Sequence, residues 1–213
     1  MTPEAFADQF DVSRETLTRL LAYQALLGRW QQRINLVGPA TLDDFWARHA
    51  ADSAQLLALS GGRRIWLDLG SGGGFPGLVV AIMLADSGGH VHLVESDGRK
   101  AAFLRTVIRE VGAPASVHNQ RAEALATAEE AFLADVQVIS ARALAPLPEL
   151  LALIAPFFNS STIALLHKGA GWQDELTRAE QCWNIDVEAH PSRTHDAARI
   201  LHLRHLSRRG EAG

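Results

Sequence analysis

The sequence Ile-Trp-Leu-Asp-Leu-Gly-Ser-Gly-Gly-Gly-Phe-Pro-Gly occupies residues 65–77. Its apolar beginning, residues 65–69, is typical of a buried β-strand, and the glycines that follow predict a sharp turn. Glycine lacks a Cβ, so the backbone of such a turn can approach a ligand closely. Residues 75–84 predict a helix, whose first turn would direct free N–H groups toward the same place. The segment therefore predicts a strand, a ligand-binding loop and a helix.

Strands and helices alternate along the rest of the chain. Further strands are predicted at residues 90–95, 116–119, 136–140 and 162–167, and further helices at residues 98–111, 123–132, 147–154 and 173–183. Repeated strand-helix units imply a parallel sheet with right-handed crossovers. The last two predicted strands, residues 185–188 and 200–206, have no helix between them, which implies one antiparallel strand in that sheet. We therefore expect an α/β fold with a mostly parallel, seven-stranded sheet.

Two helices are predicted in front of the first strand. Residues 13–34 place apolar side chains on one stripe behind Ser13, a residue type that caps helices, and a second helix is predicted at residues 43–59. The sequence contains no internal repeat and no low-complexity linker. We expect a single domain over residues 1–213, with a helical extension at residues 1–62 and a seven-stranded core at residues 63–213.

The composition limits where the protein acts. The chain has 213 residues, 47% of them hydrophobic, and a formal net charge of −4. It shows no apolar run of about 18 residues, as a membrane helix needs, and no signal-peptide pattern at its start. The lone cysteine, Cys182, cannot form an internal disulfide, which suits a reducing compartment. We therefore expect a cytoplasmic protein without membrane contact, in which Cys182 is buried as packing.

The glycine loop fits two kinds of nucleotide ligand. Read as Gly72-x-Gly74-x-x-Gly77 it matches the dinucleotide fingerprint, whereas Gly70-x-Gly72-x-Gly74 matches the S-adenosylmethionine loop. We prefer the second interpretation because its first glycine directly follows the strand, and because the last strand pair lacks a helix. A short-chain dehydrogenase would also need a Tyr-x-x-x-Lys pair, and the single tyrosine, Tyr23, lies on the first long helix.

The acid at the end of the second strand agrees with that interpretation. Glu95 lies where a carboxylate can accept hydrogen bonds from both hydroxyls of an adenosine ribose. The strand, the loop, the helix and the acid together predict a class I S-adenosylmethionine-dependent methyltransferase with a Rossmann-like fold. S-adenosylmethionine is then the expected cofactor.

The residues after the fourth strand narrow the choice of methyl acceptor. A cytosine-C5 enzyme needs an attacking cysteine near the site, but Cys182 lies far downstream. An enzyme acting on an exocyclic amine usually carries an Asn/Asp-Pro-Pro-aromatic turn, and residues 140–146 read Ser-Ala-Arg-Ala-Leu-Ala-Pro instead. Arg142 suits an unprotonated, electron-rich acceptor such as a guanine N7, which needs no general base. This elimination does not name the atom. The nine histidines are scattered without zinc-site spacing, so we expect no metal.

A set of short motifs is spread over almost the whole chain. The motifs are Asn35-Leu36, Arg48-His49-x-x-Asp52-Ser53, the glycine loop from Leu67 to Gly77, Lys100-x-x-Phe103-Leu104-Arg105, Arg121-Ala122-Glu123, Ser140-Ala141-Arg142-Ala143 and His167-Lys168-Gly169. In these motifs the sequence resembles the glucose-inhibited division protein B family, bacterial 16S rRNA guanine-N7 methyltransferases. The resemblance implies methylation of a guanine N7 in 16S rRNA, recognised on the small ribosomal subunit or on an assembly intermediate.

The resemblance also implies roles for individual residues. Arg142 is the expected catalytic residue, at the meeting point of cofactor and substrate. The residues expected to bind the cofactor are Gly70, Gly72, Gly74, Phe75, Glu95 at the ribose, Ala122 and Glu123 at the adenine, and Arg142. The residues expected to contact RNA are Asn35, His49, Arg121, Lys168 and Arg199. The chain departs from the usual family pattern at Ser71 and Gly73 in the loop, and at Ala141, which stands between Ser140 and Arg142.

Several of these residues also have simpler interpretations. Asn35 could turn the chain after the first long helix, and His49 and Asp52, three residues apart, could bond each other. Glu123 could stabilise a helix N-terminus, and Arg199 could be a solvated charge. At the level of the whole protein, two alternatives to a methyltransferase stay open: a regulatory protein that binds the cofactor without catalysis, and an NAD-dependent reductase. The net negative charge means that RNA would need a local basic rim.

Overall fold

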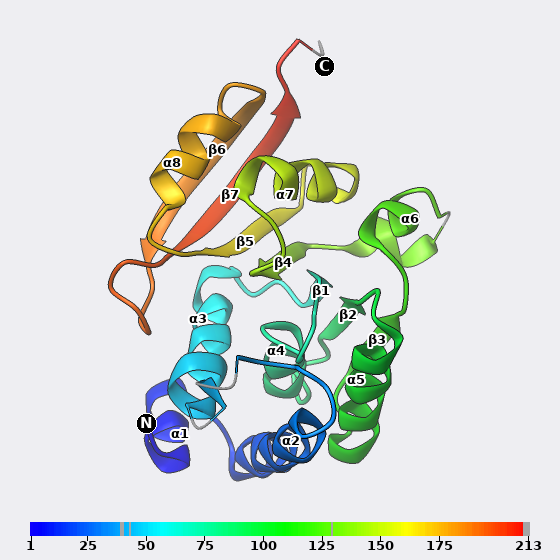
Figure 1. Cartoon of the computed structure of the whole chain (residues 1–213), viewed down its shortest axis with the longest axis vertical. Coiled ribbons are helices and arrows are strands. Elements are labelled where there is room, and N and C mark those ends of the chain that lie inside the picture. The colour runs from blue at the N-terminus through cyan, green and yellow to red at the C-terminus, as the bar shows by residue number, and fades with distance from the viewer. Residues whose placement is uncertain (39–40, 43, 129, 211–213) are drawn as a thin grey trace.

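The computed structural model describes residues 1–38, 41–42, 44–128 and 130–210, within which seven strands form one sheet. The strand order is β3-β2-β1-β4-β5-β7-β6 (Figure 1). The strands are β1 (Ile65–Leu69), β2 (His90–Val94), β3 (Ala115–His118), β4 (Val138–Arg142), β5 (Ile163–Lys168), β6 (Trp183–Pro191) and β7 (Arg199–Arg208). Strands β1 to β5 pair in parallel, while β7 runs antiparallel to both β5 and β6. The predicted sheet with one inserted antiparallel strand is confirmed.

The order of the strands determines where a ligand can bind. Strand β1 lies between β2 and β4. From β1 the chain adds β2 and β3 on one side of the sheet, and from β4 it adds β5 and the last two strands on the other side, so the strand order reverses at β1. Such a reversal opens a crevice at the carboxyl ends of the two central strands. The glycine loop leaves β1 at this edge, and residues 143–146 leave β4 beside it. The topology therefore places both segments singled out in the sequence at one end of the molecule.

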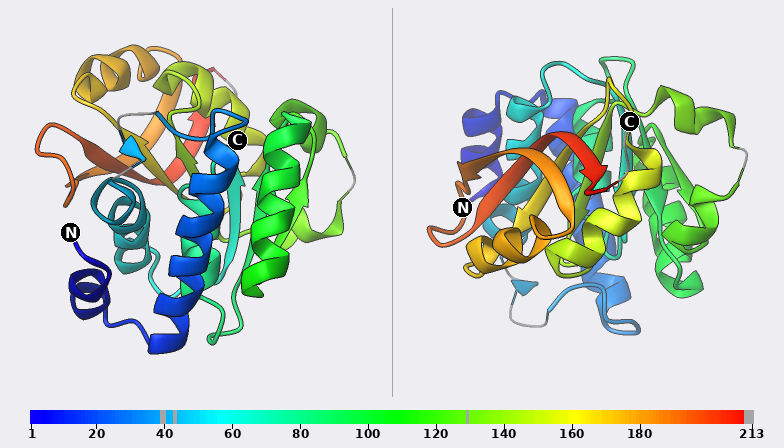
Figure 2. Two further views of the ribbon diagram at one scale, coloured as in Figure 1. Left: turned by 60° about the horizontal axis from the view of Figure 1, so that its bottom comes forward. Right: turned by 90° about the horizontal axis from the view of Figure 1, so that it is seen from above.

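Helices cover both faces of the sheet, as the two views in Figure 2 show. On one face lie α1 (Pro3–Phe10), α2 (Arg14–Gln31), α3 (Ala51–Leu59), α4 (Gly77–Met83) and α5 (Gly98–Val111), which share one hydrophobic core. On the other face lie α6 (Ala122–Ala126), α7 (Leu147–Ile154) and α8 (Trp172–Ala179), which share a second core. None of the helices in the described ranges combines the length and the apolar character that crossing a bilayer requires.

The N-terminal helices pack directly onto the sheet layer. The ring of Tyr23 on α2 is fully buried and stacks on Phe75 of the glycine loop, with ring centroids 5.3 Å apart. Trp30, nearer the end of α2, lies 5.6 Å from Phe103 of α5, again between ring centroids. Full burial of a large apolar side chain stabilises a fold by roughly 1.5–3 kcal/mol. These contacts therefore attach the N-terminal helices firmly to the elements that carry the site.

Local signals account for the elements that were predicted well. Helix α5 begins and ends at the predicted residues, because the Asp97 side chain accepts the N–H of Arg99 at 2.8 Å and Gly112 ends the helix at φ +64°. The predicted cap of α2 is also confirmed, since Ser13 Oγ accepts the N–H of Thr16 at 3.1 Å. In both cases a short polar side chain satisfies free backbone donors of the first turn.

Other elements differ from the prediction. A helix that the sequence analysis did not foresee, α1, precedes α2 and is capped by Thr2. The helix predicted at residues 43–59 begins as a π-helix, η2 (Phe45–Ala50), while Asp43 lies outside the described residues. The helix predicted at residues 123–132 ends at Ala126, and a 3₁₀ turn, η3 (Ala131–Asp135), follows.

The end of the chain shows the largest differences. Strands β6 and β7 are longer than predicted, and Trp183 opens β6 instead of closing a helix. In β6 single apolar residues alternate with exposed polar residues, and a register shift between Asp186 and Val187 interrupts the pairing with β7. The hydrophobic pattern of this strand is therefore weak. The prediction that Cys182 is buried is wrong: it is exposed in the turn before β6. A turn after a short helix leaves its side chain in solvent.

Candidate functional site

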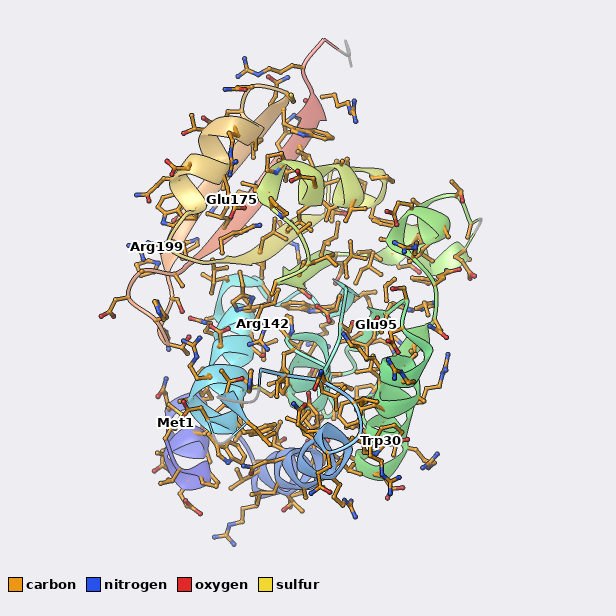
Figure 3. The ribbon with its side chains drawn as sticks, in the orientation of Figure 1. Met1, Trp30, Glu95, Arg142, Glu175 and Arg199 are labelled. Atoms are coloured by element: carbon orange, nitrogen blue, oxygen red, sulfur yellow. The ribbon has the colours of Figure 1, made fainter. Side chains whose placement is uncertain are left out.

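A groove runs along the carboxyl ends of the central strands. Its larger part is a cavity of about 1050 Å³, and its smaller part is a cavity of about 400 Å³. The two parts share the lining residues Gly70, Gly72, Lys100, Ala143 and Leu144. In Figure 3, Arg142 lies between Glu95 on one side and Arg199 on the other. The groove is therefore continuous across the point where the strand order reverses.

The glycine loop forms the floor of this groove. Gly70 and Gly74 have φ values of +68° and +93°, which residues with a Cβ rarely adopt. A Cβ on Gly74 would lie 2.6 Å from the hydroxyl of Tyr23, which donates a hydrogen bond to the carbonyl of Gly73. Burial holds the pKa of the Tyr23 hydroxyl well above its ordinary value, so it remains a proton donor. The only tyrosine of the chain thus holds the loop from below.

Glu95 follows β2 and is fixed by the backbone. One carboxylate oxygen accepts the N–H of Gly72 at 2.9 Å, and the other accepts the N–H of Asp97 at 2.8 Å. The Asn119 side chain donates to the Glu95 carbonyl at 2.8 Å. The residue is only 7% exposed and lines the smaller cavity. Each carboxylate oxygen keeps capacity for another donor, so the smaller cavity presents a prepositioned acceptor pair.

The other residues expected at the adenine lie at the same cavity. Ala122 and Glu123 are the first residues of α6, and together with Arg121 they line the smaller cavity. Glu123 lies in the first turn of α6 with an exposed side chain, so its position agrees both with the helix-dipole interpretation and with ligand contact. Arg121, expected on the RNA side, is thereby located beside the expected adenine pocket.

An aromatic stack joins the glycine loop to the N-terminal helices. The Phe75 ring stacks on Tyr23 and also on the His49 ring, whose centroid is 4.6 Å away at an interplanar angle of 22°. The Arg142 guanidinium lies over the same Phe75 ring, 5.0 Å from its centroid. Phe75 is 4% exposed, so it is a packed wall of the larger cavity.

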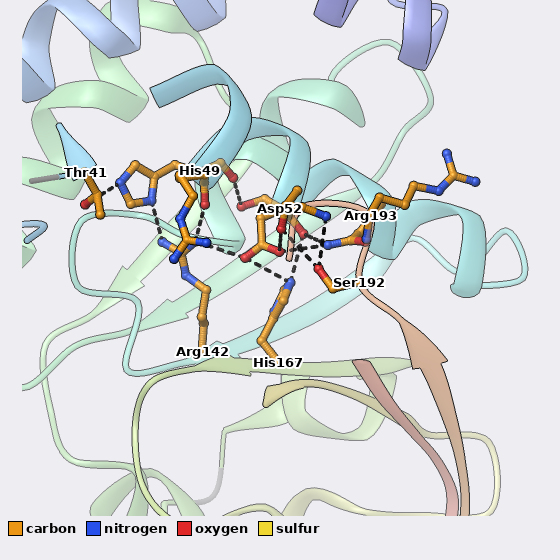
Figure 4. A network of polar contacts seen from close by, with 11 residues as sticks. Thr41, His49, Asp52, Arg142, His167, Ser192 and Arg193 are labelled. Carbon is orange, nitrogen blue, oxygen red and sulfur yellow. Dashed lines mark hydrogen bonds and ion pairs between the residues drawn. The ribbon is translucent and has the colours of Figure 1, made fainter. Parts of the chain in front are cut away.

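Arg142 is the last residue of β4 and points across the groove to α3. Its Nη1 donates to the Arg48 carbonyl and to the Asp52 carboxylate, both at 3.2 Å, and its Nη2 donates to His49 Nδ1 at 3.0 Å (Figure 4). The next residue, Ala143, has a φ of +53°, a left-handed conformation that costs on the order of 1 kcal/mol outside glycine. This turn redirects the chain after β4, and Ala143 and the next three residues line the larger cavity beside Arg142.

His49 and Asp52 do not bond each other. Both contact Arg142 instead, so the simpler interpretation of a local bond between them is not what the structure shows. His49 Nε2 lies 3.1 Å from the hydroxyl of Thr41. Burial, aided by the Arg142 charge, lowers the pKa of His49 to about 4. The imidazole is therefore neutral near pH 7, and its Nδ1 lone pair accepts the Arg142 hydrogen bond.

Asp52 is the centre of the polar network in Figure 4. Its Oδ1 accepts the hydroxyl of Thr194 at 2.7 Å and the side-chain amide of Gln55 at 2.8 Å. His167 Nε2 donates to the Asp52 carbonyl at 2.8 Å. Burial opposes ionisation of Asp52, yet the neighbouring His167, Thr194 and Arg142 hold its pKa below the ordinary value. The carboxylate is therefore charged and engaged on both oxygens.

Lys168 occupies the end of β5 and is almost enclosed. Its Nζ donates to the Ala145 carbonyl at 2.7 Å and to Glu175 Oε2 at 2.9 Å, and its side chain is 7% exposed. Glu175 also accepts the N–H of Leu147 at 2.6 Å. Although burial opposes its ionisation, Lys168 and that N–H lower the pKa of Glu175. Lys168 thus ties the segment after β4 to α8 and forms part of the cavity wall.

The remaining residues expected at RNA lie at the rim. Arg199 opens β7, one residue before the predicted start of that strand, and its Nη1 donates to the carbonyls of Asp196 and Ala198 at 2.7 Å. Its guanidinium carbon lies 6.0 Å from the centroid of the Trp172 ring. Asn35 is exposed and is not among the residues that line the larger cavity, although the adjacent Leu36 is.

Asp68 lies beneath the glycine loop, out of solvent. Its Oδ1 accepts the hydroxyl of Ser140 at 2.7 Å, which joins β1 to β4 under the groove. Burial raises the pKa of Asp68 to about 6, against the hydrogen bonds that favour its charged form. In the sequence Asp68 is marked only by its place in the glycine-loop motif, and no pattern indicates a role for Thr194 or Gln55. Nothing local in the sequence marks those two, since they reach the site through tertiary contacts.

The larger cavity is cationic. Among the described residues that line it, five carry a positive charge and two a negative charge: Arg48, Lys100, Arg142, Lys168 and Arg199, against Asp52 and Glu175. Both carboxylates are already engaged in ion pairs, with Arg142 and Lys168. In the described part of the chain, no group of three or more His, Cys, Asp or Glu side chains has an arrangement suited to a metal ion.

Comparisons with known proteins identify relatives along nearly the whole chain. The GidB family model, described as rRNA small subunit methyltransferase G, matches residues 16–203. A protein of that name, ribosomal RNA small subunit methyltransferase G of Parvibaculum lavamentivorans, is 52% identical over 205 residues, which cover 95% of this chain and 89% of that protein. The protein of the same name from Rhodospirillum centenum is 53% identical over 206 residues, 96% of this chain and 91% of that protein.

A solved structure supports the fold. The structure of the O-methyltransferase from Bacillus cereus in complex with SAH superimposes on this chain with a TM-score of 0.60. The match covers 94% of this chain and 95% of that enzyme, with 14% sequence identity. At that identity the likeness concerns the fold alone. The predicted class of fold, a Rossmann-like sheet of the methyltransferase type, is confirmed.

Proposed function

The chain belongs to the rRNA small subunit methyltransferase G family, and we propose that it transfers a methyl group from S-adenosylmethionine to N7 of a guanine in 16S rRNA. The family resemblance seen in the sequence is confirmed by these relatives. The observation that carries the finer proposal is the two-part groove. A carboxylate held by the backbone, Glu95, lies at the smaller part of the groove. The larger part has cationic walls, and Arg142 is one of the residues that line it.

The smaller part of the groove fits the adenosine of the cofactor. Glu95 offers one acceptor oxygen to each ribose hydroxyl while the backbone holds it in place, and Ala122 and Glu123 would flank the adenine. The loop glycines Gly70 and Gly72 line this part and would let the backbone lie close to the ligand. Gly74 packs against Tyr23 and Leu78 and would act by holding the loop, and Phe75 would meet the cofactor from the wall of the larger part. When bound, S-adenosylmethionine supplies an activated methyl group on a sulfonium. The chain then has to place a nucleophile in line with that methyl group.

The larger part of the groove suits a nucleic acid base and its phosphates. Although the whole chain carries a net charge of −4, the cavity lining has an excess of cations. Local positive charge is what brings a polyanion to an acidic protein. We propose that Arg121, Arg199 and Asn35 contact RNA with their exposed or half-buried side chains. Arg199 lines the larger part of the groove, Arg121 lines the smaller part, and Asn35 precedes the lining residue Leu36. His49 and Lys168 would act from the wall, where they already have partners.

Arg142 is the proposed catalytic residue. Three of its five N–H groups are used by Arg48, Asp52 and His49, which leaves two without a partner among the residues that the structure describes. An arginine fits the O6 and N7 edge of guanine. Donation to O6 would orient the base and leave the N7 lone pair free to attack. N7 carries no proton at neutral pH, so the reaction needs no base.

At the larger cavity both carboxylates and His49 are already engaged, which agrees with this acceptor, while His167 bonds the Asp52 carbonyl and His195 accepts the N–H of Ala197 at 3.3 Å. Among the described residues of the larger cavity, Asp52 is paired with Arg142 and Glu175 with Lys168. His49, whose pKa lies at about 4, uses its lone pair toward Arg142. An exocyclic amine or a hydroxyl acceptor would need a group to take its proton. A guanine N7 does not, and this is why we prefer it.

We also propose that the chain acts as one unit in the cytoplasm, on the small subunit or an assembly intermediate. Its helical extension, residues 1–62, shares a core with the sheet of residues 63–213. The test is transfer of tritiated methyl groups from S-adenosylmethionine to small subunits, to free 16S rRNA and to large subunits, each from cells lacking this modification. Label on a small-subunit RNA is expected. Binding of S-adenosylmethionine with no label on any substrate would favour the regulatory alternative.

A further inference from the structure

We propose that Asp52 is a positioning residue that holds Arg142 against the larger cavity and ties the β6–β7 loop, residues 192–198, to the same carboxylate. The inference rests on the proposed function, because it assigns Asp52 a part in the same reaction. Asp52 lies on α3, in the N-terminal extension, whereas Arg142 ends a central strand of the sheet. The two partners are 90 positions apart in the chain.

The Asp52 carboxylate joins three elements of the fold. Its Oδ2 accepts from Arg142 Nη1 at 3.2 Å, and its Oδ1 accepts from the Thr194 hydroxyl at 2.7 Å. The same Oδ1 accepts from the Gln55 amide, one turn along α3, at 2.8 Å. The Asp52 and Arg142 side chains are 14% and 19% exposed, so water competes little for these bonds. A charge pair at this depth fixes geometry more firmly than one on the surface.

The loop is held on two points. Gln55 Oε1 accepts the N–H of Arg193 at 2.8 Å, and Thr194 reaches the Asp52 carboxylate directly. Residues Thr194, His195 and Ala198 of this loop line the larger cavity. The position of the loop therefore decides the shape of one cavity wall. Because Asp52 contacts both the loop and Arg142, a displacement of that wall is transmitted to the guanidinium.

The constraint on Arg142 has a direct chemical consequence. A guanidinium at the end of a long side chain can rotate. Its free N–H groups point at an acceptor in a fixed direction only if its other N–H groups are held by hydrogen bonds. The Asp52 carboxylate and the Arg48 carbonyl accept the two N–H groups of Arg142 Nη1, and His49 accepts one N–H of Nη2. The Nε–H and the second N–H of Nη2 are then left for a ligand in the cavity. A misplacement of about 1 Å at a reacting base can cost on the order of 100-fold in rate. Asp52 would therefore act on catalysis through Arg142, without touching the substrate.

The first variant is Asp52→Asn, which keeps the size of the side chain. If its Oδ1 still accepts from Thr194 and Gln55, its new amide faces Arg142 Nη1, donor against donor. Hydrogen bonds to charged groups contribute about 1.5–3 kcal/mol, so we expect the single-turnover transfer rate to fall by about 10- to 100-fold. The affinity for S-adenosylmethionine is expected to stay within about twofold, because Asp52 does not line the smaller cavity.

Two further variants make the test specific. Thr194→Val removes the bond of the loop to Asp52, together with the contact to the Ser192 hydroxyl inside the loop, and we expect it to raise KM more than it lowers kcat. Asp86→Asn is the matched control: this carboxylate is 67% exposed, pairs with Arg19 and lies at the opposite edge of the sheet. It should leave every parameter unchanged. Thermal unfolding of each variant verifies that it is folded at the assay temperature.

A double-mutant cycle separates positioning from a merely structural role. If Asp52 acts through Arg142, then Asp52→Asn adds no loss of rate in the background of Arg142→Gln. Independent, additive losses, or full activity of Asp52→Asn, would overturn the inference while leaving the proposed function intact.

A measurement on the free protein does not depend on activity. Hydrogen exchange of the backbone amides of residues 192–198 should become faster in Thr194→Val, which loses the bond to Asp52, than in the wild type and in Asp86→Asn. Unchanged exchange in Thr194→Val would overturn the coupling of the loop to Asp52, even if the wild type methylated no RNA. In that case the proposed function would have failed separately.

Discussion

Replacing Glu95 by Gln tests whether the smaller cavity binds the cofactor ribose. The wild-type carboxylate accepts two backbone N–H groups, from Gly72 at 2.9 Å and from Asp97 at 2.8 Å. A glutamine has one acceptor oxygen, so its amide must face one of these N–H groups or one ribose hydroxyl. Leaving a buried donor unpaired costs about 1–3 kcal/mol, and losing the charge weakens the ribose bonds as well. Because about 1.4 kcal/mol changes an equilibrium tenfold, we expect the Kd for S-adenosylmethionine to rise by about 10- to 100-fold.

The assay is a calorimetric titration of the free protein with S-adenosylmethionine and, separately, with S-adenosylhomocysteine. Both ligands should lose affinity equally, because they carry the same ribose. The matched control is Glu110→Gln on α5, where the carboxylate is 53% exposed and pairs with Arg109. It should bind both ligands as the wild type does. A Kd for Glu95→Gln within twofold of the wild type would refute the placement of the ribose at Glu95.

Three further changes test other parts of the account. Arg142→Ala should keep the fold but lose methyl transfer, and full activity in a transfer assay would refute its catalytic role. Tyr23→Phe removes the donor to the buried Gly73 carbonyl, which should lower the free energy of unfolding by about 1–3 kcal/mol in urea titrations; no change would contradict the bond. Asp68 has its pKa raised to about 6 by burial, so the folded protein holds a proton that the unfolded chain releases near pH 4. The stabilisation by protonated Asp68 is present below pH 4 and is lost as the pH rises through 6. The free energy of unfolding of Asp68→Asn, relative to that of the wild type, should therefore rise by on the order of 3 kcal/mol between pH 4 and pH 7. A difference that does not change with pH would count against this.

The parts of the fold that follow from local signals could be predicted from the sequence. The apolar run before the glycine loop, the cap at Ser13 and the cap and stop of α5 are each decided by residues within a few positions of one another. The π-helix η2 ahead of α3 and the length of β6 could not be predicted. They depend on packing against distant elements, and the hydrophobic pattern of β6 is diluted by exposed polar residues.

The site divides in the same way. Residues at the carboxyl ends of parallel strands gather at one edge, so the convergence of Gly70, Glu95 and Arg142 on one groove could be expected from their places in the sequence. The contact between Asp52 and Thr194 joins positions 142 apart, and no periodic pattern announces it. The enclosure of Lys168 by Glu175 was not expected either, because a lysine at a strand end has the same sequence context whether it is free or paired. The roles of the individual residues in binding and catalysis stay predictions.

The most direct test of the account is the position of the transferred methyl group on the RNA. Small subunits from cells lacking this modification would be labelled with the purified protein and tritiated S-adenosylmethionine, and the 16S rRNA would then be treated with chemistry that cleaves at N7-methylguanosine. The account predicts that the label maps to a single guanine and that the chain is cleaved there. Label on another base, or on a guanine that resists N7-specific cleavage, would contradict it.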